Sequence, residues 1–404
     1  MNTQVDMSSL LQKLIAHIDV AALIRDRRYL HQHPELSGQE YETSLFLKKR
    51  MEKLGYRIHP VAGTGFIATY QSQTPGPKLA FRSDIDALPI EEKSSLLNGQ
   101  PRPVCSQQAG VMHACGHDGH MAIQLELARL LMEARDELCG EILFIFEEGE
   151  EIGCGIAAML EALKSFSPDA IYGTHLYTGL DCGQIACRKG PVMAGSMRFE
   201  LEVKGKAGHS SRPDLAISPI FAAAEIISGL GSRYLNVNHP EHAVTLGIST
   251  LHGGTAFNVI PEMVEATGTL RFYHRDIAEH AAQEYIRCAE ATAKAQGAQA
   301  TCRFVPIFDP VVNNEKLAES FAQALPKLCP ELNLDQDLRW FASESFSRYC
   351  ELAPCLFTFT GARNIKEGCF AEHHHAQFEI DERALRHGVI AALTFLFAQH
   401  AEGN

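Results

Sequence analysis

The chain has 404 residues, which exceeds the size at which a single hydrophobic core usually stops growing, so we expect two domains, one inserted in the other. Its composition, 46% hydrophobic and 21% charged, is that of an ordinary soluble globular protein and excludes disordered and collagen-like classes. A formal net charge of −13 without a basic run argues against a nucleic-acid partner.

Two further features concern where the protein works. The N-terminal segment has no basic region followed by a continuous apolar stretch, and no run of about 18 apolar residues occurs anywhere, so we expect neither an export signal nor a membrane span. The 12 cysteines are scattered without a Cys-x-x-Cys pair, as expected for free thiols in a reducing compartment. We therefore expect a cytoplasmic protein.

Helices and strands alternate over the first 190 residues. Helical periodicity covers residues 10–56 and stops at Gly55, strand-like runs follow at 65–71 and 78–86, a helix is expected from about His120 to residue 138, and 140–148 is an apolar strand. This alternation predicts an α/β fold with a mostly parallel sheet. Residues 1–190 form the first part of this expected catalytic domain.

The pattern of expected helices and strands changes at residue 191. Residues 191–305 read as strand, helix, two strands and helix with clean alternation, which predicts a compact α+β insertion of the ferredoxin-like type. Residues 306–404 return to helices and short strands and are expected to complete the catalytic domain.

The stretch HACGHDGH, residues 113–120, concentrates polar side chains with chemical potential. Its glycines argue against a continuous helix, so we place it in a loop that leads into a helix, with Asp118 a candidate cap. In a loop, Cys115 and His117 can converge on one metal ion, whereas His113 and His120 suit orienting or packing roles. A thiolate nucleophile at Cys115 is the alternative.

Other polar side chains follow expected strands. The run FEEGEEIGCG, residues 146–155, carries four carboxylates past a buried strand, and a dication would relieve their repulsion. Asp84 and Asp86 end another strand and, two apart, point to the same side. His175 ends a third strand, and three histidines stand at 373–375. Together these groups indicate a metal site, although each alone also suits a turn or a solvated surface.

In this order the motifs resemble those of metal-dependent amidohydrolases such as hippurate hydrolase, indole-acetyl-amino-acid hydrolase and N-acetyldiaminopimelate deacetylase, a branch of the aminoacylase and carboxypeptidase-like metallopeptidases. The resemblance spans nearly the whole chain. It is carried by FRSDIDALPIEE, GVMHACGHDGHMA, EEIGCG, KGPVMAG, KGKAGHSSRP, GGTAFNVIPE and HHHAQFEIDERAL.

The resemblance implies a pair of divalent ions, and zinc, manganese, cobalt and nickel all suit such ligands. Transferred position by position, the ligands are Cys115, His117, Glu151, His175 and His374. The general base is Glu150, which would take a proton from the attacking water and return it to the leaving amine. Because adjacent residues in a strand diverge, Glu150 and Glu151 must lie on a turn, as Gly149 permits.

The resemblance also assigns supporting roles. Asp84 and Asp86 would orient a ligand or the water. In the inserted domain, His209 and Asn258 would reach the substrate, and Arg271 is a candidate for its carboxylate, although a sheet-face ion pair is equally expected there. The inserted domain is expected to act as a lid and to pair two copies of the chain.

The chain departs from the family pattern at four places. The usual Gln-Pro-Ala before the base is Glu-Glu-Gly at 147–149, and Gly-His-Gly-Ala is Gly-His-Ser-Ser at 208–211. Ser-Glu-Asp-Phe is Ser-Glu-Ser-Phe at 343–346, which removes a carboxylate. His-Ser-Pro is His-His-Ala at 374–376, so the ligand is either of two histidines, and counting back from Phe378 favours His374.

The function that the resemblance implies is hydrolysis of the amide bond of a small N-acyl amino acid. A dipeptidase or aminopeptidase on the same scaffold is the first alternative, and the Ser-Ser variation at 210–211 gives it weight. A metal-binding protein without catalysis and a thiol enzyme are the alternatives from other classes.

Overall fold

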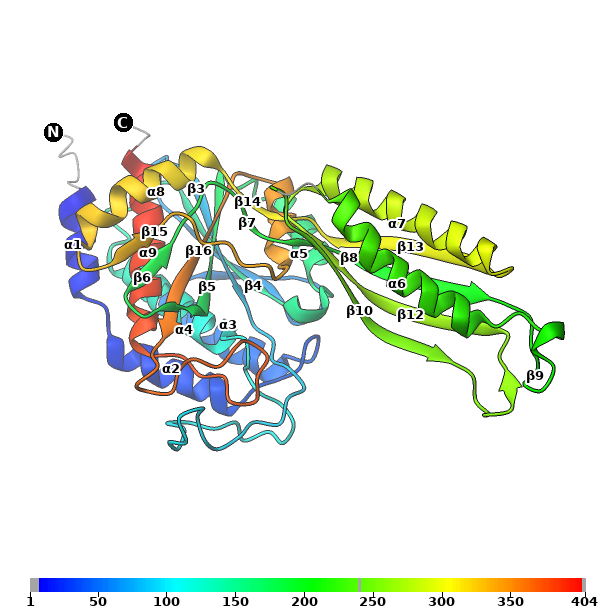
Figure 1. The fold of residues 1–404 in the computed structure, drawn as a ribbon. Helices are drawn as coiled ribbons and strands as arrows, with labels where there is room; N and C mark the ends of the chain where they lie inside the picture. The colour runs from blue at the N-terminus through cyan, green and yellow to red at the C-terminus, as the bar shows by residue number, and fades with distance from the viewer. Residues whose placement is uncertain (1–6, 239–240, 402–404) are drawn as a thin grey trace. The chain divides into compact units, whose positions relative to one another are not determined.

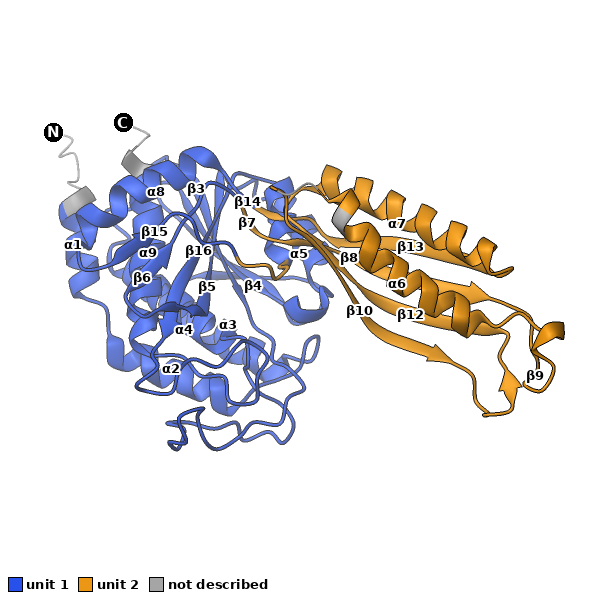
Figure 2. Ribbon diagram, viewed as in Figure 1, with its two compact units in different colours: residues 1–190, 312–339, 345–404 blue, residues 191–311, 340–344 orange. Residues whose placement is uncertain are grey.

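The computed structural model describes residues 7–238 and 241–401. It divides into two compact units, one of Met1–Gly190, Val312–Arg339 and Ser345–Asn404, the other of Pro191–Val311 and Trp340–Glu344 (Figure 2). The sequence placed the end of the insertion at residue 305 instead of 311. Residues 1–6, within the segment expected to lack an export signal, lie outside the described part.

Three helices open the first unit: α1 (Met7–Ala16), α2 (Val20–Gln32) and α3 (Tyr41–Leu54). Asp19 caps α2 by accepting a hydrogen bond from the amide of Ala22 at 2.9 Å. Gly55 ends α3 in the left-handed conformation, with φ of 99°, as the sequence predicted.

An eight-stranded sheet forms the centre of the first unit. Its order is β1-β2-β4-β3-β5-β16-β6-β15, and the four central strands β4, β3, β5 and β16 are parallel. The carboxyl ends of these strands therefore lie along one edge of the sheet (Figure 1). The strands are β1 (Arg57–Pro60), β2 (Phe66–Gln71), β3 (Lys78–Asp84), β4 (Glu141–Glu147), β5 (Ala170–Asp181), β6 (Gln184–Ala186), β15 (Asn333–Asp335) and β16 (Cys355–Arg363).

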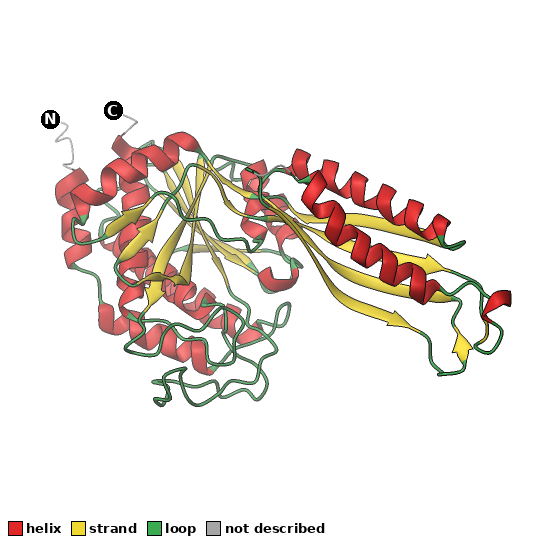
Figure 3. Cartoon of the chain, viewed as in Figure 1, coloured by secondary structure: helices red, strands yellow, loops and turns green. Residues whose placement is uncertain are grey.

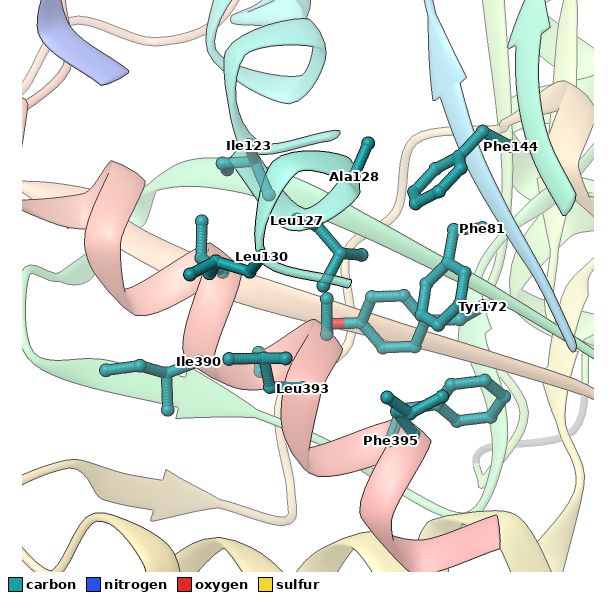
Figure 4. Close-up of a cluster of buried hydrophobic side chains, with 14 of the residues drawn as sticks. Phe81, Ile123, Leu127, Ala128, Leu130, Phe144, Tyr172, Ile390, Leu393 and Phe395 are labelled. Carbon is teal, nitrogen blue, oxygen red and sulfur yellow. The ribbon is translucent and has the colours of Figure 1, made fainter. Parts of the chain in front are cut away.

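The main core lies between this sheet and two helices, α4 (His117–Glu133) and α9 (Arg383–Ala401). Figure 4 shows sheet side chains meeting leucines of both helices. The ring of Phe395 packs on Phe81 and Tyr172 at centroid distances of 5.7 and 5.1 Å. This packing fixes α4, whose first residues belong to the candidate site.

The opposite face of the sheet carries a 3₁₀ helix, η3 (Ser345–Glu351), which contacts α5 (Ile156–Lys164). Gly173 makes room for it, because a Cβ atom there would lie 2.6 Å from the ring of Phe346. The absence of a side chain at position 173 therefore lets η3 approach the sheet closely.

The second unit is a four-stranded antiparallel sheet with two helices on one face (Figure 3). The strand order β10-β12-β8-β13 and the chain order strand, helix, two strands, helix, strand are those of a ferredoxin-like fold. This confirms the expected fold class. The elements are β8 (Gly195–Lys204), α6 (Pro219–Val237), β10 (Val244–Gly253), β12 (Met263–Phe272), α7 (Arg275–Ala295) and β13 (Gln299–Phe308).

The chain enters and leaves the second unit along a pair of adjacent strands, β7 (Gly190–Met193) and β14 (Val311–Asn313). Each unit has its own hydrophobic cluster, so the insertion does not interrupt the core of the first unit. The remaining elements are η1 (Glu150–Ile152), β9 (Gly208–His209), η2 (Pro213–Leu215), β11 (Val259–Ile260) and α8 (Glu315–Leu328).

None of the helices within the described ranges combines the length and apolar character that crossing a bilayer requires. All 12 cysteines have free thiols.

Candidate functional site

The candidate site lies at the carboxyl edge of the parallel strands in the first unit. Asp84 ends β3 and stands in register with Glu147, which ends β4. His175 lies on β5, next to β3, and α4 begins at His117. All four side chains are buried, so their charges and hydrogen bonds act with little screening by water.

Cys115 lies in a loop that leads directly into α4. Gly116 adopts φ of 91° and turns the chain, so the helix begins at His117, earlier than the expected start near His120. Gly119 lies in the first turn, where a larger residue would not fit, because a Cβ atom there would lie 2.3 Å from Leu176. The two glycines that argued against a helix therefore permit an early start, and the buried thiol of Cys115 lies 3.5 Å from Nε2 of His175.

Asp118 does not cap α4, so that expectation was wrong. Its carboxylate accepts hydrogen bonds from Nε of Arg27 at 2.8 Å and lies 2.8 Å from Nδ1 of His31. Burial alone would raise the pKa of Asp118, but Arg27 and His31 outweigh it and hold this pKa well below the ordinary range. Asp118 thus anchors α4 to α2.

His117 is oriented by a carboxylate. Its Nδ1 donates to Oδ1 of Asp86 at 3.1 Å and lies 3.0 Å from the carbonyl oxygen of the same residue. Its Nε2 lies 3.6 Å from Oδ2 of Asp84 and is buried without a hydrogen-bond partner among the described residues. Burial opposes a positive charge on His117, but Asp84 and Asp86 raise its pKa to about 10. The surroundings of Nε2 therefore favour a cation.

His120 has both ring nitrogens occupied. Nδ1 donates to Oδ1 of Asp84 at 2.8 Å, and Nε2 accepts from the amide of Leu176 at 2.9 Å. His113 is also buried, and burial lowers its pKa to about 4, so it is neutral. The structure thus places His120 as an orienting partner of Asp84, the kind of role expected from the sequence.

Glu150 and Glu151 lie on the short helix η1, entered through Gly149 with φ of 58°, which confirms the predicted turn. Oε1 of Glu150 accepts a hydrogen bond from the amide of Ser345 at 3.0 Å. The amide of Glu151 donates to Oδ2 of Asp86 at 3.1 Å. The turn therefore brings both carboxylates to His117, and the donor atoms of these three residues lie within 4.8 Å of one another.

His175 lies within β5, whereas the sequence predicted that it ends the strand. β5 continues to Asp181 because β16 pairs with it beyond the point where β3 stops. Nδ1 of His175 donates to the carbonyl of Leu176 at 2.8 Å, which leaves Nε2 facing Cys115. Burial holds the pKa of His175 well below its ordinary value, so the ring is neutral.

His374 reaches the site from the loop before α9. It adopts φ of 63°, a conformation unusual for a residue other than glycine, and its amide donates to the carbonyl of Ala114 at 2.9 Å. Its Nε2 lies 3.2 Å from Oε1 of Glu151. His373 also contacts the site, with Nδ1 3.8 Å from the sulfur of Cys115, while its ring stacks on Tyr177.

Two groups of metal-ligand type meet at one sulfur. In each, one donor atom from every residue lies within 4.8 Å of the others. Cysteine, histidine and carboxylate side chains are a donor set that fits zinc and similar divalent ions, and it includes Nε2 of His117, which lacks a hydrogen bond among the described residues. The residues therefore fit a metal centre. The groups are Cys115, His117 and His175, and Cys115, Glu151 and His374.

The three residues expected to bind substrate belong to the second unit. His209 on β9 pairs in register with Val259 on β11, and the amide of Ser210 donates to the carbonyl of Asn258 at 3.1 Å, so His209 and Asn258 lie close together. Arg271 on β12 donates to the hydroxyl of Ser343 at 2.6 Å, and burial lowers its pKa.

Several residues that support the site were missed in the sequence. Ser37 donates to Oδ2 of Asp86 at 2.7 Å, and Glu40 accepts from the amide of Gly149 at 2.9 Å. Arg82, two residues before Asp84 on β3, was overlooked because a basic residue in a strand usually faces solvent. Its burial between the carboxylates of Asp84 and Glu147 gives no local sequence signal. Two positions that depart from the family pattern, 147 and 345, contact each other.

Comparison with known proteins decides the family. The model of Peptidase family M20/M25/M40 matches residues 80–397. The chain belongs to this family. It is 38% identical to the N-acetylcysteine deacetylase of Bacillus subtilis over 90% of this chain and 93% of that protein. It is 34% identical to thermostable carboxypeptidase 2 of Saccharolobus solfataricus, covering 91% of this chain and 93% of the other.

Other M20 members agree with this assignment. An IAA-amino acid hydrolase of Arabidopsis thaliana is 34% identical over 90% of this chain and 83% of its own length. The crystal structure of the Bacillus subtilis YXEP protein, described as a dinuclear metal-binding peptidase, superposes with a TM-score of 0.80 at 34% identity, covering 94% and 97% of the two chains. The expected family and enzyme class are thus confirmed: the chain is a metal-dependent amidohydrolase.

Proposed function

We propose that this enzyme hydrolyses the amide bond of small N-acyl amino acids and that two divalent ions bind at the carboxyl edge of its main sheet. The observation that carries the proposal is the meeting of two donor groups at Cys115, each completed by two further residues. The similar proteins named as a deacetylase and an IAA-amino acid hydrolase support the substrate class.

In this proposal Cys115, His117, His175, Glu151 and His374 would hold the ions. The proposal is supported by two groups of donor atoms that lie within 4.8 Å of one another, Cys115 with His117 and His175, and Cys115 with Glu151 and His374. Zinc, manganese, cobalt and nickel all suit these ligands. When bound, the ions would lower the pKa of water and polarise the substrate carbonyl.

Glu150 is proposed as the general base. It neighbours Glu151 on η1, so a water molecule held near one carboxylate lies within reach of the other. The amide of Ser345 holds Oε1 of Glu150 in place. Glu150 would take the proton of the attacking water and pass it to the leaving amine.

Asp84 and Asp86 are proposed to orient the site. Asp86 binds Nδ1 of His117, which directs Nε2 toward the donor group and makes the ring a stronger ligand. Asp84 is held by His120 and Arg82 and lies 3.6 Å from Nε2 of His117. Both carboxylates therefore fix the imidazole on which one donor group depends.

The second unit is proposed to contribute His209 and Asn258 to the substrate, with Arg271 for its carboxylate, and to join two copies of the enzyme. Apolar side chains of α6 and the edge strand β10, including Ile227, Leu230 and Ile248, line a hollow that supports such pairing. Light scattering on the purified enzyme tests the pairing of two copies, since a monomer at micromolar concentration would contradict it.

A cytoplasmic location is also proposed for the enzyme, and the free thiols support it.

The test of the base is Glu150→Gln, which keeps the shape of the side chain. We expect bound metal to be unchanged and kcat for N-acetyl amino acids to fall by about 10²–10⁴-fold. Glu148→Gln, on the same turn, is the matched control and should keep its activity. Near-normal turnover of Glu150→Gln with metal bound would remove Glu150 from the mechanism.

The alternative function is peptide hydrolysis on the same scaffold. The similarity to a thermostable carboxypeptidase gives it a specific basis. A panel of N-acetyl and N-benzoyl amino acids against dipeptides, run after metal reconstitution, separates the two. A higher kcat/KM for dipeptides than for every N-acyl amino acid would contradict the proposed substrate class.

A further inference from the structure

A buried arginine connects the candidate site to the opposite face of the sheet. Arg82 on β3 donates from Nε to Oε2 of Glu147 at 2.7 Å and from Nη1 to Oδ2 of Asp84 at 2.9 Å. Its Nη2 donates to the hydroxyl of Ser345 at 2.9 Å. The side chain of Arg82 is only 2% exposed, so these hydrogen bonds take the place of its contacts with water.

The carboxylate of Glu147 accepts hydrogen bonds from two hydroxyl groups of η3. Ser345 donates to Oε1 at 2.6 Å, and Tyr349 donates to Oε2 at 2.8 Å. Burial and the carboxylate of Glu147 raise the pKa of Tyr349 well above its ordinary value, so the phenol keeps the proton that it donates. All three side chains are fully buried.

The main chain of the same serine holds the proposed base. The amide of Ser345 donates to Oε1 of Glu150 at 3.0 Å while its side chain is fixed between Arg82 and Glu147. Glu147 is also the last residue of β4, three positions before Glu150. A shift of the side chain of Ser345 therefore moves the group that holds the base.

We propose that Arg82, Glu147, Ser345 and Tyr349 form a positioning network for Glu150, and that the carboxylate of this network can be moved from position 147 to position 345 with most of the activity retained. This inference rests on the proposed role of Glu150. The four residues act through Glu150 and do not touch the substrate. The contact between positions 147 and 345 is what makes the transfer feasible.

The transfer conserves both charge and hydrogen bonds. With an amide at 147, its oxygen accepts from Arg82 and Tyr349 as the carboxylate does now, and its NH₂ group donates toward position 345. With a carboxylate at 345, Nη2 of Arg82 gains an anionic acceptor in place of the neutral hydroxyl of Ser345, while Nε donates to the neutral amide oxygen at 147. The hydrogen bond between positions 147 and 345 is reversed in direction. Either change alone leaves the network with an uncompensated charge or an unmatched donor.

The test compares Glu147→Gln, Ser345→Asp and the double variant in the full-length enzyme loaded with metal. We expect each single change to lower kcat for an N-acetyl amino acid by about 10–100-fold with KM and bound metal unchanged, because the base is displaced. We expect each to lower the Tm by about 5–10 °C. The double variant should regain kcat to within about fivefold of the wild type and most of the Tm.

A milder change and a control complete the design. Tyr349→Phe removes one donor to Glu147 and should lower kcat by about 3–10-fold in a folded protein. Glu148→Gln changes a carboxylate to an amide on the same turn, outside the network, and should stay within twofold of the wild type.

Two results would overturn the inference. The first is wild-type kcat in both single variants. The second is a double variant whose losses of kcat and Tm equal the combined losses of the two single variants. If the wild type hydrolyses no member of the substrate panel, the proposed function fails. The Tm values of the four proteins then still decide whether positions 147 and 345 exchange their charge.

Discussion

Nε2 of His374 lies 3.2 Å from Oε1 of Glu151, whereas Nδ1 of His375, the next residue, accepts a hydrogen bond from the amide of Gln377 at 3.1 Å. The two histidines that the sequence left as alternatives thus have different surroundings. His374 owes its position to its left-handed backbone and to its hydrogen bond with Ala114.

The two histidines provide a matched pair of variants. His374→Ala should lower kcat/KM by more than about 100-fold and reduce the bound metal, because it removes a proposed ligand. His375→Ala should keep both near the wild-type values. Metal content by elemental analysis, measured beside activity, checks this. Equal loss in both variants would contradict the distinction.

Metal removal should lower both activity and stability. A chelator is expected to abolish hydrolysis and lower the Tm, since ions that bind only the folded state stabilise it, and added metal should restore both. Cys115→Ala should show little further change of Tm with the chelator, whereas Cys154→Ala, an exposed cysteine, should respond like the wild type. An unchanged Tm of the wild type after verified metal loss contradicts this prediction.

Gly173→Ala should disturb the site from the far face of the sheet. The added methyl group would lie 2.6 Å from the ring of Phe346 and push η3, so we expect a loss of about 1–3 kcal/mol in the free energy of unfolding and a lower kcat. Gly247→Ala in β10, where nothing lies within 4 Å, should be nearly neutral. Denaturant unfolding of both variants checks the difference, and similar losses would contradict it.

His31 should make stability depend on pH. Burial and Arg27 lower its pKa, but its hydrogen bonds with Asp118 and Glu92 outweigh them, so the folded pKa lies above the ordinary 6.5. A raised folded pKa gives stability that is full below about pH 6.5 and is lost as the pH rises through the folded value. Urea unfolding between pH 6 and pH 9 should therefore show this loss.

His31→Gln should be less stable than the wild type at pH 6, with a smaller fall toward pH 9. His33→Gln serves as the control and should follow the wild-type profile, because His33 is a partly exposed neighbour whose ring donates to the carbonyl of Tyr29. Parallel profiles for wild type and His31→Gln would show that the titration of His31 does not contribute.

Much of the fold was predictable because its signals are local. Periodicity placed α3 and its end at Gly55, and alternation in 191–305 gave the ferredoxin-like unit. The start of α4 was predicted too late, because Gly116 and Gly119 break helices by propensity but here fit a turn and a close contact with Leu176. The length of β5 depended on pairing with β16, which no local pattern reveals.

For the site, the motifs named residues that the structure brings together, among them Cys115, Glu151 and His374. What the sequence did not reveal is how they are supported. Arg82 and Ser345 are far apart in the chain, and their contact follows from the packing of η3 on the sheet. The role of Asp118 was misjudged for the same reason, since its partner Arg27 lies on a different helix.

The adjacent strands β7 and β14, through which the chain enters and leaves the second unit, have a consequence for how such enzymes diversify. Because the two ends of the insertion lie side by side and each unit has a separate hydrophobic cluster, the inserted unit can gain or lose residues without shifting the register of the eight-stranded sheet. The second unit can thus change its sequence and length independently, while the donor groups around Cys115 in the first unit stay unchanged.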